Sequence, residues 1–297
     1  MSRAFSRLAR LAAVAAAVYC GTGAAARLHA FVSVLPLRTF VEQVGGERVN
    51  VRSLVQPGQS PASYEPTPRQ MAAVSRADVF FRVGVPFEAA WMDRIRRANP
   101  QMTVVDLRQG VALRPIGEHH HDDHQGGGEG ETDAGPAMDP HVWTDPTRAA
   151  VMVETIGATL TRLDPDGSAG YRSRADAYKR ELQRLDTEIR QRLAGLRHRR
   201  FLVYHPSWGY FADAYGLEQI AIEREGKEPG PRSLAAVIDQ ARREDIRTVF
   251  VQSQFSRHSA EAVARAIDGR VVQVDPLSAD YAANLRRVAE ALAGAMR

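Results

Sequence analysis

The chain has 297 residues, of which 44% are hydrophobic and 25% are charged. Its length suffices for two domains or one large domain, and its composition excludes a fibrous or intrinsically disordered protein. The formal net charge is +4, but three of the 39 basic residues lie in a predicted leader without acids. The other 36 basic residues nearly balance the 35 acidic ones, so the pI of about 9.4 is no argument for binding nucleic acid or a membrane surface.

Residues 1–26 have the pattern of a secretory signal peptide. Three arginines precede an apolar run that ends at Tyr19, and the small-residue site Ala24–Ala26 follows. The apolar run is too short to span a bilayer, so the pattern favours export over a membrane anchor. We therefore expect a periplasmic protein.

The only cysteine of the chain, Cys20, lies within this leader. A lipid anchor on Cys20 is the alternative to a cleaved leader, but Tyr19 is bulky where lipoprotein sites usually have a small residue. An exported chain that matures without cysteine has neither disulfides nor thiolate ligands. Any metal site in the mature protein must then consist of histidine, aspartate and glutamate side chains.

After the leader, strand-like apolar runs alternate with segments of helical period. The predicted strands are residues 31–35, 49–55, 79–83, 103–106, 201–204, 248–252 and 271–274. The predicted helices are residues 37–44, 68–75, 87–98, 234–243 and 259–266, and Asp145-Pro146 is expected to begin another. This alternation predicts parallel sheets with helices on their faces, which bind ligands beyond the carboxyl ends of their strands.

One interruption of this alternation is the segment from Val111 to Pro140, which contains EHHHDDHQGGG. A stretch of this length without periodicity is usually functional or disordered. Its glycines leave nothing to hold the side chains in fixed geometry, so we interpret residues 115–138 as an accessory zinc-collecting loop. The histidines of this loop are His119, His120, His121 and His124.

A second interruption is one long helical pattern over residues 171–196. Leucine and isoleucine recur there at steps of three and four, with charged residues on the opposite face. Because a helix resists bending, we expect a rigid connection between two lobes with a cleft. The expected parts are an N-terminal lobe of residues 27–170, a linking helix of residues 171–197 and a C-terminal lobe of residues 198–297.

Three polar residues occupy settings that suit a metal site. His141 lies between two Asp-Pro pairs in MDPHVWTDP, whereas His205 and Asp275 each follow an apolar run and precede a proline. Strand ends and proline-stiffened turns can hold such side chains in one crevice. Imidazole nitrogen and carboxylate oxygen are ligands that zinc and neighbouring divalent ions accept. Taken singly, His141 or His205 is more readily interpreted as a core residue than as a metal ligand. The isolated His29, His198 and His258 are interpreted as core or surface residues.

Taken together, the motifs have a recognisable order. PG-x-x-P-x-x-YEPTP comes first, the His-rich loop stands directly before DPHVW-x-DP, and YHPSWGYFADAYGL, FVQSQFS and VDPL follow the long helix. This order resembles the zinc- and manganese-uptake group of ABC-transporter solute-binding proteins, from about Phe31 to the end of the chain. The resemblance implies two pseudo-symmetric α/β lobes, each a mainly parallel sheet flanked by helices. It also implies one spanning helix, a metal in the cleft and delivery to a membrane permease.

The resemblance also assigns metal ligands. It places the second ligand of the family at His141, the third at His205 and the acidic fourth at Asp275. Zinc members have a histidine at the third position and manganese members typically a glutamate, so His205 and the His-rich loop indicate zinc. Coordination chemistry agrees, because borderline Zn²⁺ favours imidazole whereas the harder Mn²⁺ favours carboxylate oxygen.

One position departs from the family pattern. The first ligand, a histidine, falls on Ala62 in QPGQSPASYEPTP, and alanine cannot bind a metal. The open position could be filled by water, by Glu65 from the same turn, by Glu223 or Glu225, or by a histidine of the loop. Gln254, in the FVQSQFS segment, is a candidate to hold a ligand in place.

We therefore expect a monomeric receptor, and not an enzyme, that binds zinc and hands it to the permease of an ABC importer. The alternatives are a receptor for manganese or another divalent ion, a receptor for a chelated metal or other small ligand, and a surface adhesin. A further alternative is a zinc-dependent hydrolase whose open coordination position activates water. The sequence contains no H-E-x-x-H or comparable motif that would supply the base for such a hydrolase.

Overall fold

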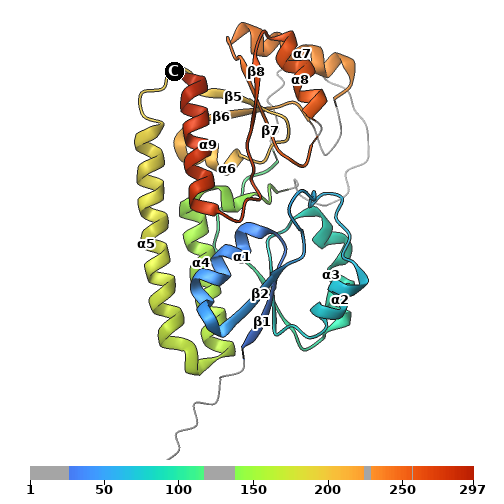
Figure 1. Ribbon diagram of the computed structural model, residues 1–297, viewed down its shortest axis with the longest axis vertical. Coiled ribbons are helices and arrows are strands. Elements are labelled where there is room, and N and C mark those ends of the chain that lie inside the picture. The colour runs from blue at the N-terminus through green and yellow to red at the C-terminus, as the bar shows by residue number, and fades with distance from the viewer. Residues whose placement is uncertain (1–26, 117–137, 224–228, 256) are drawn as a thin grey trace, which may run out of the picture.

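Two four-stranded parallel sheets form the frame of the protein, in a computed structural model that describes residues 27–116, 138–223, 229–255 and 257–297 (Figure 1). Their strand orders, β2-β1-β3-β4 and β6-β5-β7-β8, follow the same pattern. The first sheet contains β1 (Leu28–Val32), β2 (Val49–Ser53), β3 (Val79–Arg82) and β4 (Thr103–Asp106). The second contains β5 (Arg200–Val203), β6 (Glu218–Ala221), β7 (Thr248–Val251) and β8 (Arg270–Gln273). The predicted pair of similar parallel α/β lobes is confirmed.

Helices cover both faces of each sheet. In the N-terminal lobe, α1 (Leu35–Gly45) covers one face, while α2 (Pro68–Val74) and α3 (Pro86–Ala98) cover the other (Figure 1). In the C-terminal lobe, α6 (Gly209–Tyr215) and α9 (Tyr281–Met296) lie opposite α7 (Pro231–Arg243) and α8 (Arg257–Ala266). Each sheet therefore has a switch point, between β1 and β3 or between β5 and β7. Ligands of open α/β sheets bind beyond the carboxyl ends of the strands at such points.

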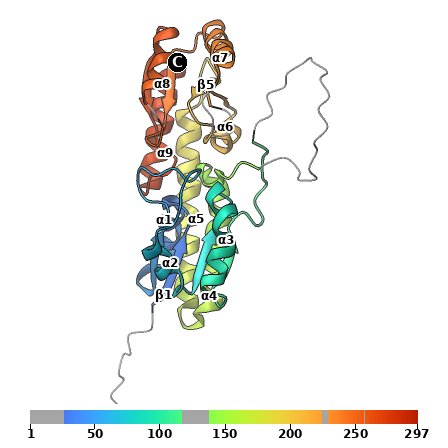
Figure 2. The same ribbon diagram turned by 90° about the vertical axis from the view of Figure 1, so that its right-hand side faces the viewer.

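The 25-residue helix α5 (Ser168–Arg192) runs along both lobes, which are stacked along the long axis (Figure 2). At 1.5 Å per residue, it is about 37 Å long. Its buried residues recur at steps of three and four, as the sequence predicted, and they are Tyr171, Ala175, Tyr178, Leu182, Leu185 and Ile189. Helix α4 (Pro146–Leu163) packs along it, and α1 and α9 also contact it.

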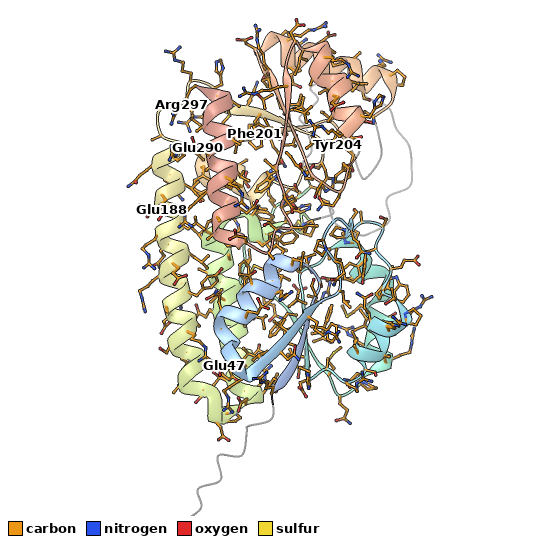
Figure 3. The ribbon with its side chains drawn as sticks, in the orientation of Figure 1. Glu47, Glu188, Phe201, Tyr204, Glu290 and Arg297 are labelled. Carbon is orange, nitrogen blue, oxygen red and sulfur yellow. The ribbon has the colours of Figure 1, made fainter. Side chains whose placement is uncertain are left out.

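Ion pairs on the outer surface join α5 to α9. Arg286 Nε lies 2.7 Å from a carboxylate oxygen of Glu188, and Arg192 Nη1 lies 2.9 Å from one of Glu290. Figure 3 shows Glu188 on α5 and Glu290 on α9, on the side of the molecule occupied by these two helices. Because these pairs are about half exposed, each contributes little to stability, and packing holds the two helices together.

One hydrophobic cluster runs through both lobes. It includes residues of both sheets, of α1, α4, α5 and α6, and of α9. A second, smaller cluster packs α7 and α8 against the outer face of the C-terminal sheet. The lobes therefore share a core and are not separate units joined only by a linker. No helix in the described part of the chain is long and apolar enough to cross a membrane.

Most element boundaries differ from the sequence predictions by a few residues, and two of the differences have a clear local cause. The predicted strand 31–35 is wrong at its end, because Leu35 begins α1, whose first turn contains Pro36. The predicted helix 171–196 begins earlier and ends at Arg192, before Gly195 adopts a φ of 69°. The helix expected at Asp145-Pro146 is confirmed, since the Asp145 carboxylate accepts a hydrogen bond of 2.7 Å from the backbone N–H of Thr147.

Candidate metal centre

Polar residues gather just past the carboxyl ends of the strands in the C-terminal sheet. His205 follows β5, Glu223 follows β6, Gln252 follows β7 and Asp275 follows β8. In a parallel sheet the carboxyl ends of all strands lie at the same edge. The four residues therefore lie near one another along that edge. The switch point between β5 and β7 lies at the centre of this edge.

His205 is held from several directions. Its backbone N–H donates to Gln252 Oε1 (3.3 Å), and Gln252 Nε2 donates to the carbonyl of His205 (2.7 Å). The imidazole Nδ1 lies 2.9 Å from Glu223 Oε2, and the ring stacks on Phe255 with centroids 4.8 Å apart. Figure 3 marks Tyr204, the residue just before His205, in the C-terminal lobe. These contacts fix both the backbone and the ring of His205.

His141 lies at the start of a short 3-10 turn, Val142–Thr144. Its Nδ1 is 2.7 Å from Asp139 Oδ1, and its backbone N–H donates to the same oxygen at 2.9 Å. The carboxylate of Asp139 is almost fully buried and also faces Arg114 Nη1 at 3.4 Å. A buried carboxylate therefore orients this ring as well.

The electrostatics of Asp139 favour its charged form. Burial raises the pKa of the Asp139 carboxyl, but this effect is outweighed. Electrostatic attraction to the His141 ring, the hydrogen bonds from that ring and its backbone, and the charge of Arg114 together hold the pKa of Asp139 below its usual value. Asp139 is thus an anion placed directly behind the His141 ring.

The rings of His141 and His205 lie next to each other and are called the facing pair below. Their ring centroids are 5.4 Å apart, with an interplanar angle of 76°. In each ring, Nδ1 is hydrogen-bonded to a carboxylate oxygen. Nε2 is therefore the ring nitrogen that can bind a metal. The structure therefore brings together two of the three predicted ligands, although 64 positions separate them in the sequence.

Asp275, the third predicted ligand, belongs to the segment that packs on the His141 turn. The indole Nε1 of Trp143 donates to the carbonyl of Pro276 (2.7 Å). The Asp275 carboxylate accepts hydrogen bonds from the backbone N–H of Leu277 (2.9 Å) and from Gln254 Nε2 (3.4 Å). Gln254 thus contacts a candidate ligand, in the role that the sequence suggested for it.

The described side chains do not form a complete coordination group. Over residues 27–116, 138–223, 229–255 and 257–297, no three His, Cys, Asp or Glu side chains are grouped so as to hold a metal ion. Ala62 and Glu65 are exposed on the turn after β2, and this turn packs on α3 through a hydrogen bond from Phe87 N–H to the carbonyl of Pro61 (3.2 Å). Asp275 and Glu65 therefore remain predicted ligands.

Of the other residues named for the open coordination position, the structure describes only Glu223. Glu223 lies behind the ring of His205, at Nδ1, so it cannot bind the ion at Nε2 of that ring while this contact is kept. Glu225 and the loop histidines His119, His120, His121 and His124 lie outside the described residues, as does the predicted leader. The other described histidines, His29, His198 and His258, are exposed, which decides between their two interpretations, core or surface, in favour of the surface.

Sequence reasoning missed the role of the carboxylates behind the rings. Asp139 is two residues before His141, where an aspartate can bond both the following backbone and the ring, so the Asp-Pro-His spacing carried a usable signal. The role of Glu223 depends on the pairing of β5 with β6, in which Val203 lies opposite Ala221. Strand β6 was not predicted, so the sequence named Glu223 only as a possible ligand and not as the partner of the His205 ring.

Comparison with known proteins decides the family. The family model described as zinc-uptake complex component A, periplasmic, matches residues 31–295. The chain belongs to this family. A crystal structure of ZnuA is 38% identical, with a TM-score of 0.85 over 91% of this chain and 100% of that one. The family resemblance and the fold expected from the sequence are both confirmed.

Two curated relatives differ in the metal that their names state. The zinc-binding lipoprotein AdcA of Streptococcus pneumoniae serotype 4 is 28% identical over 255 residues, which is 84% of this chain and 50% of that protein. The chain thus spans about half the length of this relative. The manganese-binding lipoprotein MntA of Halalkalibacterium halodurans is 29% identical over 221 residues, or 73% and 68% of the two chains.

Proposed function

We propose that this protein is a periplasmic zinc receptor that captures Zn²⁺ and delivers it to the permease of an ABC importer. The observation that carries the proposal is the facing pair His141 and His205, with ring centroids 5.4 Å apart and a carboxylate on Nδ1 of each ring. Two neighbouring imidazoles, each with its Nδ1 held by a carboxylate and its Nε2 left for a metal, are a suitable start for a zinc site. Asp275 is the proposed third ligand, and water or Glu65 completes the set in place of a residue at position 62.

Zinc is preferred over manganese because of the donor atoms. Both residues of the facing pair are imidazoles, which Zn²⁺ favours more strongly than Mn²⁺ does. Membership in a zinc-uptake family supports the same choice, and it also supports a receptor over the zinc-dependent hydrolase. The manganese-binding relative MntA keeps Mn²⁺ as the competing cargo to be tested.

In the proposed mechanism the protein binds the zinc ion and does not catalyse a reaction. Imidazole binds a metal only in its neutral form, so acidification weakens binding and zinc uptake releases protons where the rings were charged. We propose that the chain acts as a monomer, with a lobe of residues 27–170, a linking helix of residues 171–197 and a lobe of residues 198–297. The leader of residues 1–26 would direct it to the periplasm, with a lipid on Cys20 as the alternative.

The test is competition for zinc between the metal-free protein and a chelator of known affinity. We expect one tight site in the native protein and a loss of affinity of at least about a hundredfold in His141→Ala and in His205→Ala. This exceeds the ten- to hundredfold cost of removing a group that only supports a ligand. His198→Ala, at an exposed position, is the matched control and should bind like the native protein.

Two results would contradict the proposal. Native affinity in both histidine variants would exclude the facing pair as the zinc site. Tighter binding of Mn²⁺ than of Zn²⁺ by the native protein would replace zinc as the cargo.

A further inference from the structure

We propose that Asp139 and Glu223 are positioning residues, which hold the two imidazoles with hydrogen on Nδ1 and the lone pair of Nε2 available to the ion. This inference rests on the proposed function, because it explains how the facing pair is prepared for zinc. It also assigns roles to two acids that are not themselves ligands.

The tautomer follows from the contacts. A carboxylate oxygen only accepts hydrogen bonds, so a ring nitrogen at 2.7 or 2.9 Å from it must donate. Nδ1 of His141 therefore carries hydrogen towards Asp139, and Nδ1 of His205 carries hydrogen towards Glu223. A neutral imidazole has one hydrogen only, so Nε2 of each ring is left with its lone pair. Both rings are then ready to bind before the ion arrives.

The fold holds each carboxylate where it is needed. Tyr210 of α6 donates from its hydroxyl to the carbonyl of Asp139 (2.9 Å), which ties the segment before His141 to the C-terminal lobe. Glu223 continues β6 by two residues, just as His205 continues β5. The parallel register of the two strands therefore places them side by side, and the backbone N–H of Glu223 donates to the carbonyl of Tyr204 (2.8 Å).

The two carboxylates differ in what else they contact. The second oxygen of Asp139 faces the Arg114 guanidinium at 3.4 Å, so a cation shares its charge. Oε1 of Glu223 is buried and has no hydrogen-bond partner among the residues that the structure describes. A carboxylate behind a ring increases the basicity of that ring as a ligand.

The first experiment compares isosteric amide variants. Asp139→Asn and Glu223→Gln keep the shape of each side chain but remove its charge. Zinc affinity, measured by chelator competition, should fall about ten- to hundredfold in each. Equal affinity in all three proteins would overturn the inference.

The matched control is Glu88→Gln, which removes a carboxylate that is fully buried in the N-terminal lobe. Glu88 accepts hydrogen bonds from the hydroxyl of Ser33 (2.5 Å) and the backbone N–H of Val83 (2.8 Å), and contacts neither histidine. Its loss should change zinc affinity by less than about twofold. A loss as large as that of Glu223→Gln would mean that removing any buried carboxylate has this effect, which would overturn the inference.

A second measurement begins with the native protein alone. In the metal-free native protein, ¹⁵N chemical shifts of the imidazoles report which ring nitrogen carries hydrogen. Both His141 and His205 should show hydrogen on Nδ1, and Glu223→Gln should alter the His205 signals alone. Hydrogen on Nε2 in the native protein would overturn the inference. Absence of zinc binding by the native protein would instead overturn the proposed function, while these shifts would still decide the positioning role.

Discussion

At the scale of single residues, position 62 is where this chain departs from the family pattern. The family resemblance expects a metal-binding histidine there, and the chain has alanine, exposed on the turn after β2. The turn belongs to the N-terminal lobe, whereas the contacts of His141, His205 and Asp275 involve the C-terminal lobe. Without that histidine, the N-terminal lobe contributes no imidazole from this turn.

Restoring the family residue should therefore strengthen binding. In Ala62→His we expect zinc affinity to rise at least about tenfold, which corresponds to about 1.4 kcal/mol, because the ion gains a fixed ligand in place of a weaker one. Chelator competition measures the change. Ser63→His, which puts an imidazole at the exposed neighbouring position, is the control and should have no such effect. An unchanged affinity in Ala62→His would mean that the turn does not reach the facing pair.

At the scale of single elements, the turn between α4 and α5 is fixed by one ion-paired carboxylate. Arg48 donates to both oxygens of Asp164, each at 2.7 Å, and the hydroxyl of Tyr171 donates at 2.5 Å. The hydrogen bonds from Arg48 are the main reason that the pKa of Asp164 falls to about 2, with Tyr171 adding to the effect and burial opposing it. This contact joins the start of the long helix to the N-terminal sheet.

The contribution of Asp164 to the free energy of unfolding should change with pH over a defined range. Its pKa is lower in the folded protein than the ordinary aspartate value of 3.8, which the unfolded chain is expected to have. The contribution is therefore complete above about pH 4 and is lost as the pH falls towards 2. Urea unfolding of native protein and Asp164→Asn should show a difference in free energy that shrinks over this range. The exposed Asp166→Asn is the control, and a constant difference between pH 7 and pH 2 would contradict the assignment.

Elements with a strong local pattern were predictable, and elements defined by partners were not. The predicted strand 103–106 coincides with β4, and the apolar spacing of α5 revealed its buried face. Strand β6 has the short sequence EQIA with only one fully buried residue, so its pairing with β5 defines it more than its own pattern does. For the same reason His141, His205 and Asp275 could be selected from their settings, whereas Glu223 was named only as a possible ligand and not as the support of the His205 ring.

At the scale of the whole molecule, buried contacts fasten the two lobes to each other. The ring of Phe40 in α1 meets that of Tyr281 in α9 edge to face, with centroids 4.8 Å apart. The hydroxyl of Tyr281 donates to the carbonyl of Trp143 (2.8 Å), and the Thr39 hydroxyl donates to the carbonyl of Ala279 (2.6 Å). A shared core of this kind limits how far the lobes can open, so capture should involve the segments around the site.

Unfolding should accordingly be one event. Thermal unfolding followed by circular dichroism and by tryptophan fluorescence should give coincident transitions. Tyr281→Phe should lower the free energy of unfolding by about 1–3 kcal/mol, because the buried carbonyl of Trp143 loses its donor, and should leave a single transition. Two separate transitions in the native protein would show that the lobes unfold independently and would contradict the role given to the shared core.

The position of Trp143 gives the protein an optical signal of its own state. The chain has three tryptophans, and this one is almost fully buried, 5.4 Å from the ring of His141 by centroids and bonded to the carbonyl of Pro276, next to Asp275. Indole emission responds to the charge and rigidity of its surroundings, and both change when an imidazole exchanges a proton or water for a metal ion. Cargo loading should therefore be visible in intrinsic fluorescence, without a dye or label, in real time.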